Sequence, residues 1–279
     1  MKSKISPPCR LKVLLARRAP VGVIFRRGPS KWVQVIKWDT EKDAFEEGQW
    51  FHGRIYDERS DLSPSGRLMV YFAGKFNRQT LKSNAYTYAW TAVSKPPYLT
   101  ALALWPKGDT YYGGGSFTTD RDLLLNHPPE AASPHPNHLP VGLRVKPTTK
   151  RDVPLIRSSH QDGWRVLQSL KYDYWERRTL LPGVMEKKSL SGKMKLQVEV
   201  YFDPDEQWVC SLVTDRGKEF AIGIGTWADF DHAGRLVFAS EGKLFSARLK
   251  DGKIGLREIH DFTQAEPKSV KPPAWATQW

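Results

Sequence analysis

Hydrophobic positions along the chain gather in short runs that are rich in Val, Ile, Tyr, Phe, Trp and Thr and bounded by Gly, Pro, Asp or Ser. Runs of this kind predict β-strands. The nearest candidate for a helical period, Asp162–Tyr172, fits strand alternation equally well. The pattern therefore predicts an all-β protein. The predicted strands are Leu11–Ala16, Val21–Phe25, Trp32–Trp38, Leu68–Phe72, Ala85–Val93, Leu99–Trp105, Leu196–Phe202, Trp208–Val213, Phe220–Ile224, Leu236–Ala239, Leu244–Leu249 and Ile254–Ile259.

Turn signals separate these strands. The sequence Lys250-Asp-Gly-Lys253 contains Asp-Gly, which favours a tight hairpin because both central residues tolerate a positive φ. Arg27-Gly-Pro-Ser30 is a similar break between two strands. The 20 prolines and 21 glycines along the chain suit many turns better than a few long helices.

One turn sequence occurs twice. Asp61–Lys75 aligns without gaps on Asp229–Lys243, 168 residues later, and six of the fifteen positions are identical. Lys95-Pro-Pro97 follows the first copy and Lys271-Pro-Pro273 follows the second, so the order of the flanking segments is preserved. A spaced internal repeat predicts an array of similar β-units.

Backbone chemistry explains the shared residues. An Asp that begins a turn accepts hydrogen bonds from N–H groups two residues further on. Gly66 and Gly234 are expected at a positive φ. The Arg-Leu pair that follows would begin an inner strand with one side chain outward and one inward. The motif thus predicts a tight hairpin, and function at these turns would lie where the copies differ, at residues 63–65 and 231–233.

The motif resembles the Asp-x-Ser-Pro-Asp-Gly-Lys turn of β-propeller repeat proteins of the TolB-like and WD-repeat kind. Asp61–Leu68 matches with Ser65 in place of Asp and Arg67 in place of Lys, and Asp229–Leu236 has His232 where Pro is usual. Asp203–Asp205 and Leu104–Asp109 resemble degenerate copies. In such proteins the turn joins strands of successive blades. The resemblance implies an all-β β-propeller of about six (five to seven) four-stranded blades. The alternative architecture is two joined β-sandwiches.

The domain organisation follows from the repeat. We expect residues 1–279 to form a single propeller domain with pseudo-repeated halves, 8–126 and 141–279, joined by a Pro-rich loop, 127–140. Five prolines within residues 126–140 deny that segment ladder hydrogen bonds, so it should be an exposed connection.

Composition indicates a globular protein, with 40% hydrophobic and 26% charged residues. Cys9 and Cys210 are too few for a disulfide framework, which favours reduced thiols. The apolar run Leu11–Ala16 is too short for a signal peptide, and no stretch reaches the ~18–20 apolar residues of a membrane helix. We therefore expect a cytoplasmic protein with no membrane partner.

The net charge of +13 favours an anionic partner. Residues 1–38 carry ten Lys or Arg and no acidic residue. The candidate contacts to such a partner are Arg17, Arg18, Arg26, Arg27 and Lys31. On a hairpin of the predicted strands, the first two arginines would lie ~15–20 Å from the next two. These charges are also explained as strand-end charges that discourage edge aggregation, without any partner.

No catalytic, cofactor or metal-binding residues are predicted. His127, His135 and His138 share the Pro-rich loop, but no Cys or carboxylate pattern completes a zinc site. Gly113-Gly-Gly-Ser116 lacks the Gly-Lys-Ser/Thr of a phosphate-binding loop and predicts a close-packed turn. Asp229, Asp231 and His232 lie at a predicted turn, where Asp has a structural role.

The functional hypothesis is a non-catalytic interaction scaffold, or a subunit of a macromolecular assembly, that binds another protein through propeller-face loops. One alternative is a nucleic-acid-associated protein that uses its basic surface. The other is a propeller-type hydrolase with a pore-side cluster of Asp, His and Trp. Fold analogy carries little weight between them.

Overall fold

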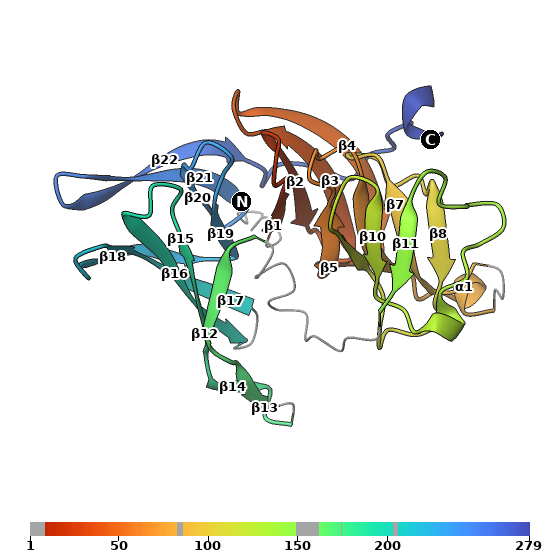
Figure 1. Ribbon diagram of the computed structural model, residues 1–279, viewed down its shortest axis with the longest axis horizontal. Coiled ribbons are helices and arrows are strands. Elements are labelled where there is room, and N and C mark those ends of the chain that lie inside the picture. Colours follow the sequence, from red (N-terminus) through yellow and green to blue (C-terminus); the bar gives the residue numbers. More distant parts are fainter. Residues whose placement is uncertain (1–8, 83–85, 149–161, 174, 203–205) are drawn as a thin grey trace, which may run out of the picture. The chain divides into compact units, whose positions relative to one another are not determined.

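The computed structural model describes residues 9–82, 86–148, 162–173, 175–202 and 206–279, and they form an all-β protein as predicted (Figure 1). The chain divides into two compact units. The larger unit comprises Val13–Arg157 and Glu266–Trp279, and the smaller comprises Met1–Lys12 and Ser158–Ala265.

The larger unit is built on two four-stranded antiparallel sheets whose strands follow one another in chain order, β1-β2-β3-β4 and β5-β6-β7-β8. Their strands are β1 Arg10–Leu15, β2 Val21–Arg27, β3 Trp32–Asp39, β4 Ala44–His52, β5 Arg54–Leu62, β6 Met69–Gly74, β7 Ala89–Ser94 and β8 Ala103–Pro106. The division between the units falls within β1. A third sheet has the order β11-β10-β9, in which β10 pairs antiparallel with β9 and parallel with β11. Its strands are β9 Gly115–Phe117, β10 Asp122–Leu125 and β11 Arg144–Pro147.

Helical segments in the described part of the chain are short. They are the α-helix α1, Arg78–Lys82, and the 3₁₀ turns Pro129–Ala131 and Ala274–Ala276. No helix among the described residues has the length and apolar character needed to cross a bilayer.

The smaller unit contains a five-stranded sheet of order β12-β15-β16-β17-β18, a two-stranded hairpin β13-β14 and a four-stranded sheet β19-β20-β21-β22. The strands are β12 Trp164–Gln168, β13 Lys171–Asp173, β14 Arg178–Leu181, β15 Gly183–Lys188, β16 Met194–Phe202, β17 Glu206–Thr214, β18 Glu219–Gly225, β19 Trp227–Phe230, β20 Leu236–Ser240, β21 Lys243–Lys250 and β22 Lys253–Asp261. The predicted Asp-Gly hairpin joins β21 to β22, with Asp251 and Gly252 both at positive φ.

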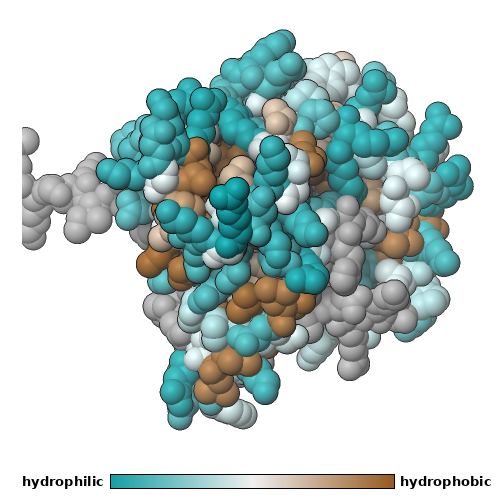
Figure 2. Space-filling model, turned by 60° about the vertical axis from the view of Figure 1, so that its left-hand side comes forward, coloured by the Kyte–Doolittle hydropathy of each residue, from teal (hydrophilic) through white to brown (hydrophobic). Residues whose placement is uncertain are grey.

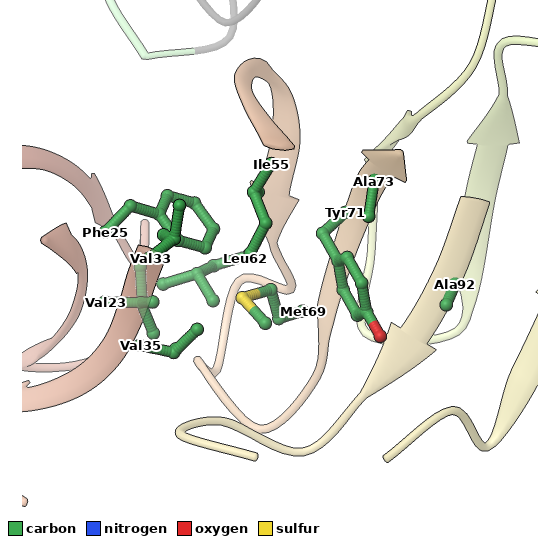
Figure 3. Packing of buried hydrophobic residues seen from close by; sticks show 11 residues of the cluster. Val23, Phe25, Val33, Val35, Ile55, Leu62, Met69, Tyr71, Ala73 and Ala92 are labelled. Carbon is green, nitrogen blue, oxygen red and sulfur yellow. The ribbon is translucent and has the colours of Figure 1, made fainter. Parts of the chain in front are cut away.

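A hydrophobic core lies between the two four-stranded sheets of the larger unit. Strands β2 and β3 contribute Val23, Phe25 and Val35, which face Leu62 and Met69 of the neighbouring sheet (Figure 3). All of these side chains are at most 3% exposed. Burying each stabilises the fold by about 1.5–3 kcal/mol relative to exposure, so the two sheets are held together mainly by this layer.

On the face shown in Figure 2, polar side chains predominate, with apolar residues in scattered groups between them. This distribution agrees with the charged content of 26%. Alternate residues are buried in β16, as the pleat of a half-buried strand requires, whereas every residue of β6 is buried.

The repeated turn joins the first two strands of a sheet in both copies. Residues 63–68 connect β5 to β6, and residues 231–235 connect β19 to β20. Both β6 and β20 are inner strands, and Gly66 and Gly234 have φ of 72° and 74°, as predicted. The expectation that the turn joins strands of successive blades is wrong, because each copy lies within one sheet.

The structure reveals a third copy that the sequence comparison missed. Ser189-Leu-Ser-Gly-Lys-Met194 joins β15 to β16 and repeats the bonds of residues 63–68. In both turns the N–H of the first serine donates to the carbonyl oxygen of the sixth residue, and the serine Oγ accepts from that residue's N–H. Residues 63, 189 and 231 are separated by 126 and 42 residues, and 126 is three times 42. The repeat therefore has a 42-residue spacing.

Of the two degenerate copies that the sequence suggested, Leu104–Asp109 lies within the described residues. Gly108, in the predicted copy Leu104–Asp109, keeps the 42-residue register from Gly66 and has φ of 72°. Its turn, however, follows β8, the last strand of its sheet. Asp203–Asp205 lies outside the described residues.

The Pro-rich segment 127–140 belongs to the larger unit, and the division of the chain falls at residues 157 and 158. His127 and His135 are buried rather than exposed. Backbone hydrogen bonds join the segment to β8, from His135 N to Leu104 O at 2.8 Å and from Leu104 N to His138 O at 3.1 Å. The prolines prevent a regular ladder of hydrogen bonds, but residues between the prolines form isolated hydrogen bonds that hold the segment against β8.

Candidate functional site

A pocket of about 790 Å³ opens in the larger unit beside the turn between β5 and β6. We call it the basic pocket. Six stretches of chain form it: strand β2, strand β3, the first copy of the repeated turn, the segment after β7, the turn between β9 and β10, and the C-terminal 3₁₀ turn. Its lining residues are Val21, Lys37, Ser63, Ser65, Gly66, Arg67, Leu68, Lys95, Pro96, Asp120, Arg121 and Trp275.

The charge of the lining is strongly positive. Four cations, Lys37, Arg67, Lys95 and Arg121, face one carboxylate, Asp120. The side chains of Lys37, Arg67 and Arg121 make no hydrogen bond or ion pair with any residue that the structure describes. A concave site lined by one sign of charge concentrates ions of the opposite sign. The arrangement is therefore suited to an anionic ligand.

The turn itself is held by Ser63. The Ser63 N–H donates to Leu68 O at 2.9 Å, and the Gly66 N–H donates to Ser63 O at 2.7 Å. The Leu68 N–H also donates to Ser63 Oγ at 3.1 Å. These bonds leave the next side chain, Arg67, exposed at the pocket.

Asp120 ties two parts of the pocket together. Its Oδ1 accepts from the Ser65 N–H at 2.8 Å and its Oδ2 accepts from Arg18 at 3.2 Å. Although partial burial opposes the effect, the Ser65 bonds and the Arg18 charge lower the pKa of Asp120. The carboxylate is thus ionised at neutral pH, and both of its oxygens are already used.

The C-terminal segment completes the wall of the pocket. Lys95 Nζ donates to the carbonyl oxygens of Trp275 at 3.0 Å and Gln278 at 2.8 Å. The Trp275 ring packs edge-on against Tyr98 with 5.5 Å between centroids, and Trp275 is 48% exposed. An aromatic side chain therefore remains accessible beside the cations.

Asp61 does not serve its own turn in the way the sequence predicted. Its carboxylate binds Arg17 through both oxygens, at 3.0 and 3.1 Å, and accepts from the Phe117 N–H at 2.7 Å. Within its own turn, the N–H of the adjacent Leu62 donates to it. The prediction of a turn-closing Asp is wrong because Ser63 closes the turn, which leaves Asp61 to join three sheets.

Asp229 acts in a similar way in the smaller unit. It binds Lys187 of β15 at 2.6 Å and accepts from the Phe230 N–H at 2.6 Å. Burial raises the pKa of Asp229, and the charge of Lys187 opposes that shift. In both copies, then, the first Asp of the motif is buried and its carboxylate bonds to residues of a neighbouring sheet.

The residues predicted to contact an anionic partner are mostly engaged within the larger unit. Arg17 binds Asp61, and Arg18 binds Asp120 while its side chain stays 65% exposed. Arg26 is buried and donates to Gly28 O, and Arg27 donates to Ile55 O and Asp57. Lys31 is exposed. None of the five lines the basic pocket.

The three histidines of the Pro-rich segment have structural partners. Thr91 Oγ1 lies 2.8 Å from His127 Nε2, and His127 Nδ1 lies 2.9 Å from Ala131 O. Burial lowers the pKa of His127 to about 4. His135 stacks on Tyr86, and His138 lies beside the Tyr86 hydroxyl. The described residues contain no group of three His, Cys, Asp or Glu placed to hold a metal ion.

The glycine run forms the close-packed turn that was predicted. A Cβ on Gly113 would lie 2.3 Å from the Phe72 ring, and one on Gly114 would lie 1.9 Å from Arg59 O. Only glycine fits where the backbone approaches so closely.

Sequence reasoning missed the basic pocket. Lys37 and Lys95 lie in or after predicted strands, and Arg121 follows no recognised motif. Arg67 was seen in the repeated turn but attributed to backbone geometry. The one available signal was the difference between the copies, Ser63-Pro-Ser65 against Asp231-His-Ala233, and two of those residues line the pocket.

Comparisons with known proteins assign no family. No family model matches the chain, and no curated protein matches it. Among solved structures, one from Bacteroides fragilis described as a putative 6-phosphogluconolactonase is similar at a TM-score of 0.21 and 11% identity, over 93% of this chain and 68% of that one. A likeness at this score supports no conclusion about fold or activity.

Proposed function

We propose that this chain is a non-catalytic interaction module of the β-propeller type, which binds an acidic segment of a partner protein in the basic pocket. The single observation that carries the proposal is the cluster of four cations around one carboxylate, already hydrogen-bonded through both oxygens, in a pocket of about 790 Å³.

The sheet order supports the propeller. Three sheets are four-stranded meanders in chain order, and β15–β18 form a fourth within the five-stranded sheet. The turns between first and second strands also touch in neighbouring sheets. In the larger unit the Arg18 N–H donates to Pro64 O at 2.9 Å, and in the smaller unit a Cβ on Gly234 would lie 3.1 Å from Leu190 Cδ1. Blades around a common axis bring equivalent turns together in this way. A 42-residue spacing over 279 residues corresponds to six to seven blades.

The size and lining of the pocket support a short peptide segment. Pockets of about 300–1,000 Å³ commonly hold compact ligands, with apolar walls and a few polar groups that orient them. Val21, Leu68, Pro96 and Trp275 supply apolar surface between the cations. A segment that carries acidic and apolar side chains would satisfy both kinds of lining.

Nucleic acid is the second candidate, favoured by the exposed ring of Trp275 beside Lys95, since bases stack on such rings. An extended phosphate backbone, however, needs a track of available cations. The basic stretch at residues 10–38 does not supply one, because Arg17, Arg26 and Arg27 are bound within the unit. The charge that remains is concentrated in a pocket, which favours the protein segment.

Affinity capture with matched variants tests the proposal. Arg67→Glu with Arg121→Glu reverses two charges of the pocket. Lys193→Glu reverses a single charge at the position of the third turn copy that is equivalent to Arg67, outside the pocket. At about 50 mM salt, we expect the wild type and Lys193→Glu to capture the same proteins from native lysate, and we expect the double variant not to capture them. The proposal fails if the double variant retains the same proteins, or if nuclease treatment removes all of them.

A further inference from the structure

The difference between the repeated turns concerns the charge of one arginine. In the second copy, Asp231 pairs with Arg235 at 2.8 Å, and the Asp231 side chain is fully buried. In the first copy the equivalent residues are Ser63 and Arg67. A serine cannot neutralise an arginine, so Arg67 keeps its full charge at the pocket. The same turn thus holds a paired arginine in the second copy and an arginine without an ion pair to described residues in the first.

A second arginine, Arg121, lies on a turn that is hydrogen-bonded to the turn of Arg67. The bond from the Ser65 N–H to Asp120 fastens the turn at residues 63–68 to the turn between β9 and β10. Arg67 follows Ser65 by two residues, and Arg121 follows Asp120 directly. The two guanidinium groups therefore come from two turns that share a hydrogen bond at their bases. This bond fixes the two turns relative to each other, so that a ligand bound by both arginines need not order the turns as well.

The number of available cations indicates the charge of the ligand. Lys37, Arg67 and Arg121 make no ion pair with described residues, and Lys95 binds only neutral carbonyl oxygens. A carboxylate brings one negative charge, whereas a phosphate monoester brings about −1.5 to −2 at pH 7 and three acceptor oxygens. Guanidinium groups bind such oxygens in pairs, which makes arginine the preferred residue for this geometry.

We propose that the basic pocket binds a phosphoserine or phosphothreonine of the partner segment, with Arg67 and Arg121 on the phosphate oxygens and Lys37 and Lys95 supporting the charge. This inference rests on the proposed function and adds the chemical state of the partner to it. The apolar walls, Val21, Leu68 and Trp275, would contact the residues that flank the phosphorylated one.

Fluorescence anisotropy with three labelled peptide pools tests the inference on the whole chain. The pools are about seven residues long and random except for a central phosphoserine, glutamate or serine. We expect the phosphoserine pool to bind at least about tenfold more tightly than the glutamate pool. Arg67→Glu with Arg121→Glu should abolish this binding, and Lys193→Glu should leave it unchanged.

A charge-conserving variant checks the role of the arginine geometry. Arg67→Lys with Arg121→Lys keeps the net charge but removes the planar fork. Its preference for the phosphoserine pool over the glutamate pool should therefore be smaller than that of the wild type, because only the part that comes from charge remains. Retention of the full preference by this variant overturns the assignment of the two arginines.

The remaining outcomes separate the two proposals. Equal binding of the phosphoserine and glutamate pools overturns the phosphate inference and leaves the acidic-segment function standing. Binding of no pool at about 50 mM salt overturns both. Tighter binding of a labelled single-stranded oligonucleotide than of any peptide pool also overturns both, in favour of nucleic acid.

Discussion

Replacing Asp61 by asparagine tests whether the repeated motif holds neighbouring sheets together. The substitution keeps the shape of the side chain and its acceptor for the Phe117 N–H but removes the charge that pairs with Arg17. The Arg17 and Asp61 side chains are only 18% and 11% exposed. The neutral amide would remove the counter-charge that Asp61 supplies to the Arg17 guanidinium.

The expected loss in the free energy of unfolding is about 2–3 kcal/mol. Removing one partner of a fully buried ion pair costs about 3–5 kcal/mol, and the remaining solvent access of Arg17 reduces that cost. With a urea slope of about 2 kcal/mol/M, the unfolding midpoint should fall by about 1–1.5 M.

Asp122→Asn supplies the control in the same unit. Arg144 also binds Asp122 through both carboxylate oxygens, at 2.5 and 2.6 Å, but the Arg144 side chain is 73% exposed. Exposed pairs contribute little, so this variant should unfold at nearly the wild-type midpoint. Urea unfolding, monitored by tryptophan fluorescence, measures the midpoints of both variants. Equal midpoints for the two variants would refute the idea that Asp61 is a buried tie between sheets.

Three further predictions concern single residues. Gly66→Ala should destabilise the larger unit more than Gly108→Ala. Both glycines have φ of 72°, but a Cβ on Gly66 would lie 2.8 Å from Val21, whereas a Cβ on Gly108 would have no neighbour nearer than 3.7 Å. Equal urea midpoints for the two variants would contradict this. His127 has its pKa lowered to about 4, below an ordinary value of 6.5, so the unfolded chain binds the proton first and stability should fall as the pH drops from about 6.5 to 4. His127→Asn should remove that part of the pH dependence of the urea midpoint, and an unchanged profile would contradict the assignment. Burial raises the pKa of Cys210 to about 12. In the Cys9→Ser variant, the Cys210 thiol of native protein at pH 8 should therefore react with a thiol reagent far more slowly than that of urea-unfolded protein. Similar rates would show that Cys210 is accessible in the native state.

Local pattern was sufficient for most inner strands of the fold. Strand β3 has buried Val33, Val35, Ile36 and Trp38, and its composition alone predicts it. All twelve predicted segments overlap strands of the structure.

Two of the strands that were missed, β4 and β5, have polar patterns. β4, at the edge of its sheet, contains Glu46 and Glu47, and β5 carries a charged run, Asp57-Glu-Arg59. Their pairing with β3 and β6 makes them strands, and no periodic apolar face marks them in the sequence. Such elements depend on the neighbouring strand for their conformation, which local propensity does not contain.

The sequence by itself determined the conformation of the repeated turn, since the positive φ of Gly66 and Gly234 follows from residue type and position. Only the tertiary structure decided the electrostatic role of each charge. Arg17 is neutralised by Asp61, 44 residues away, whereas Arg67 stays open because Ser63 stands where the other copy has Asp231. The four cations of the basic pocket come from four separate stretches of chain. Burial and ion pairing depend on which segments pack together, so a count of basic residues along the chain could not locate the site.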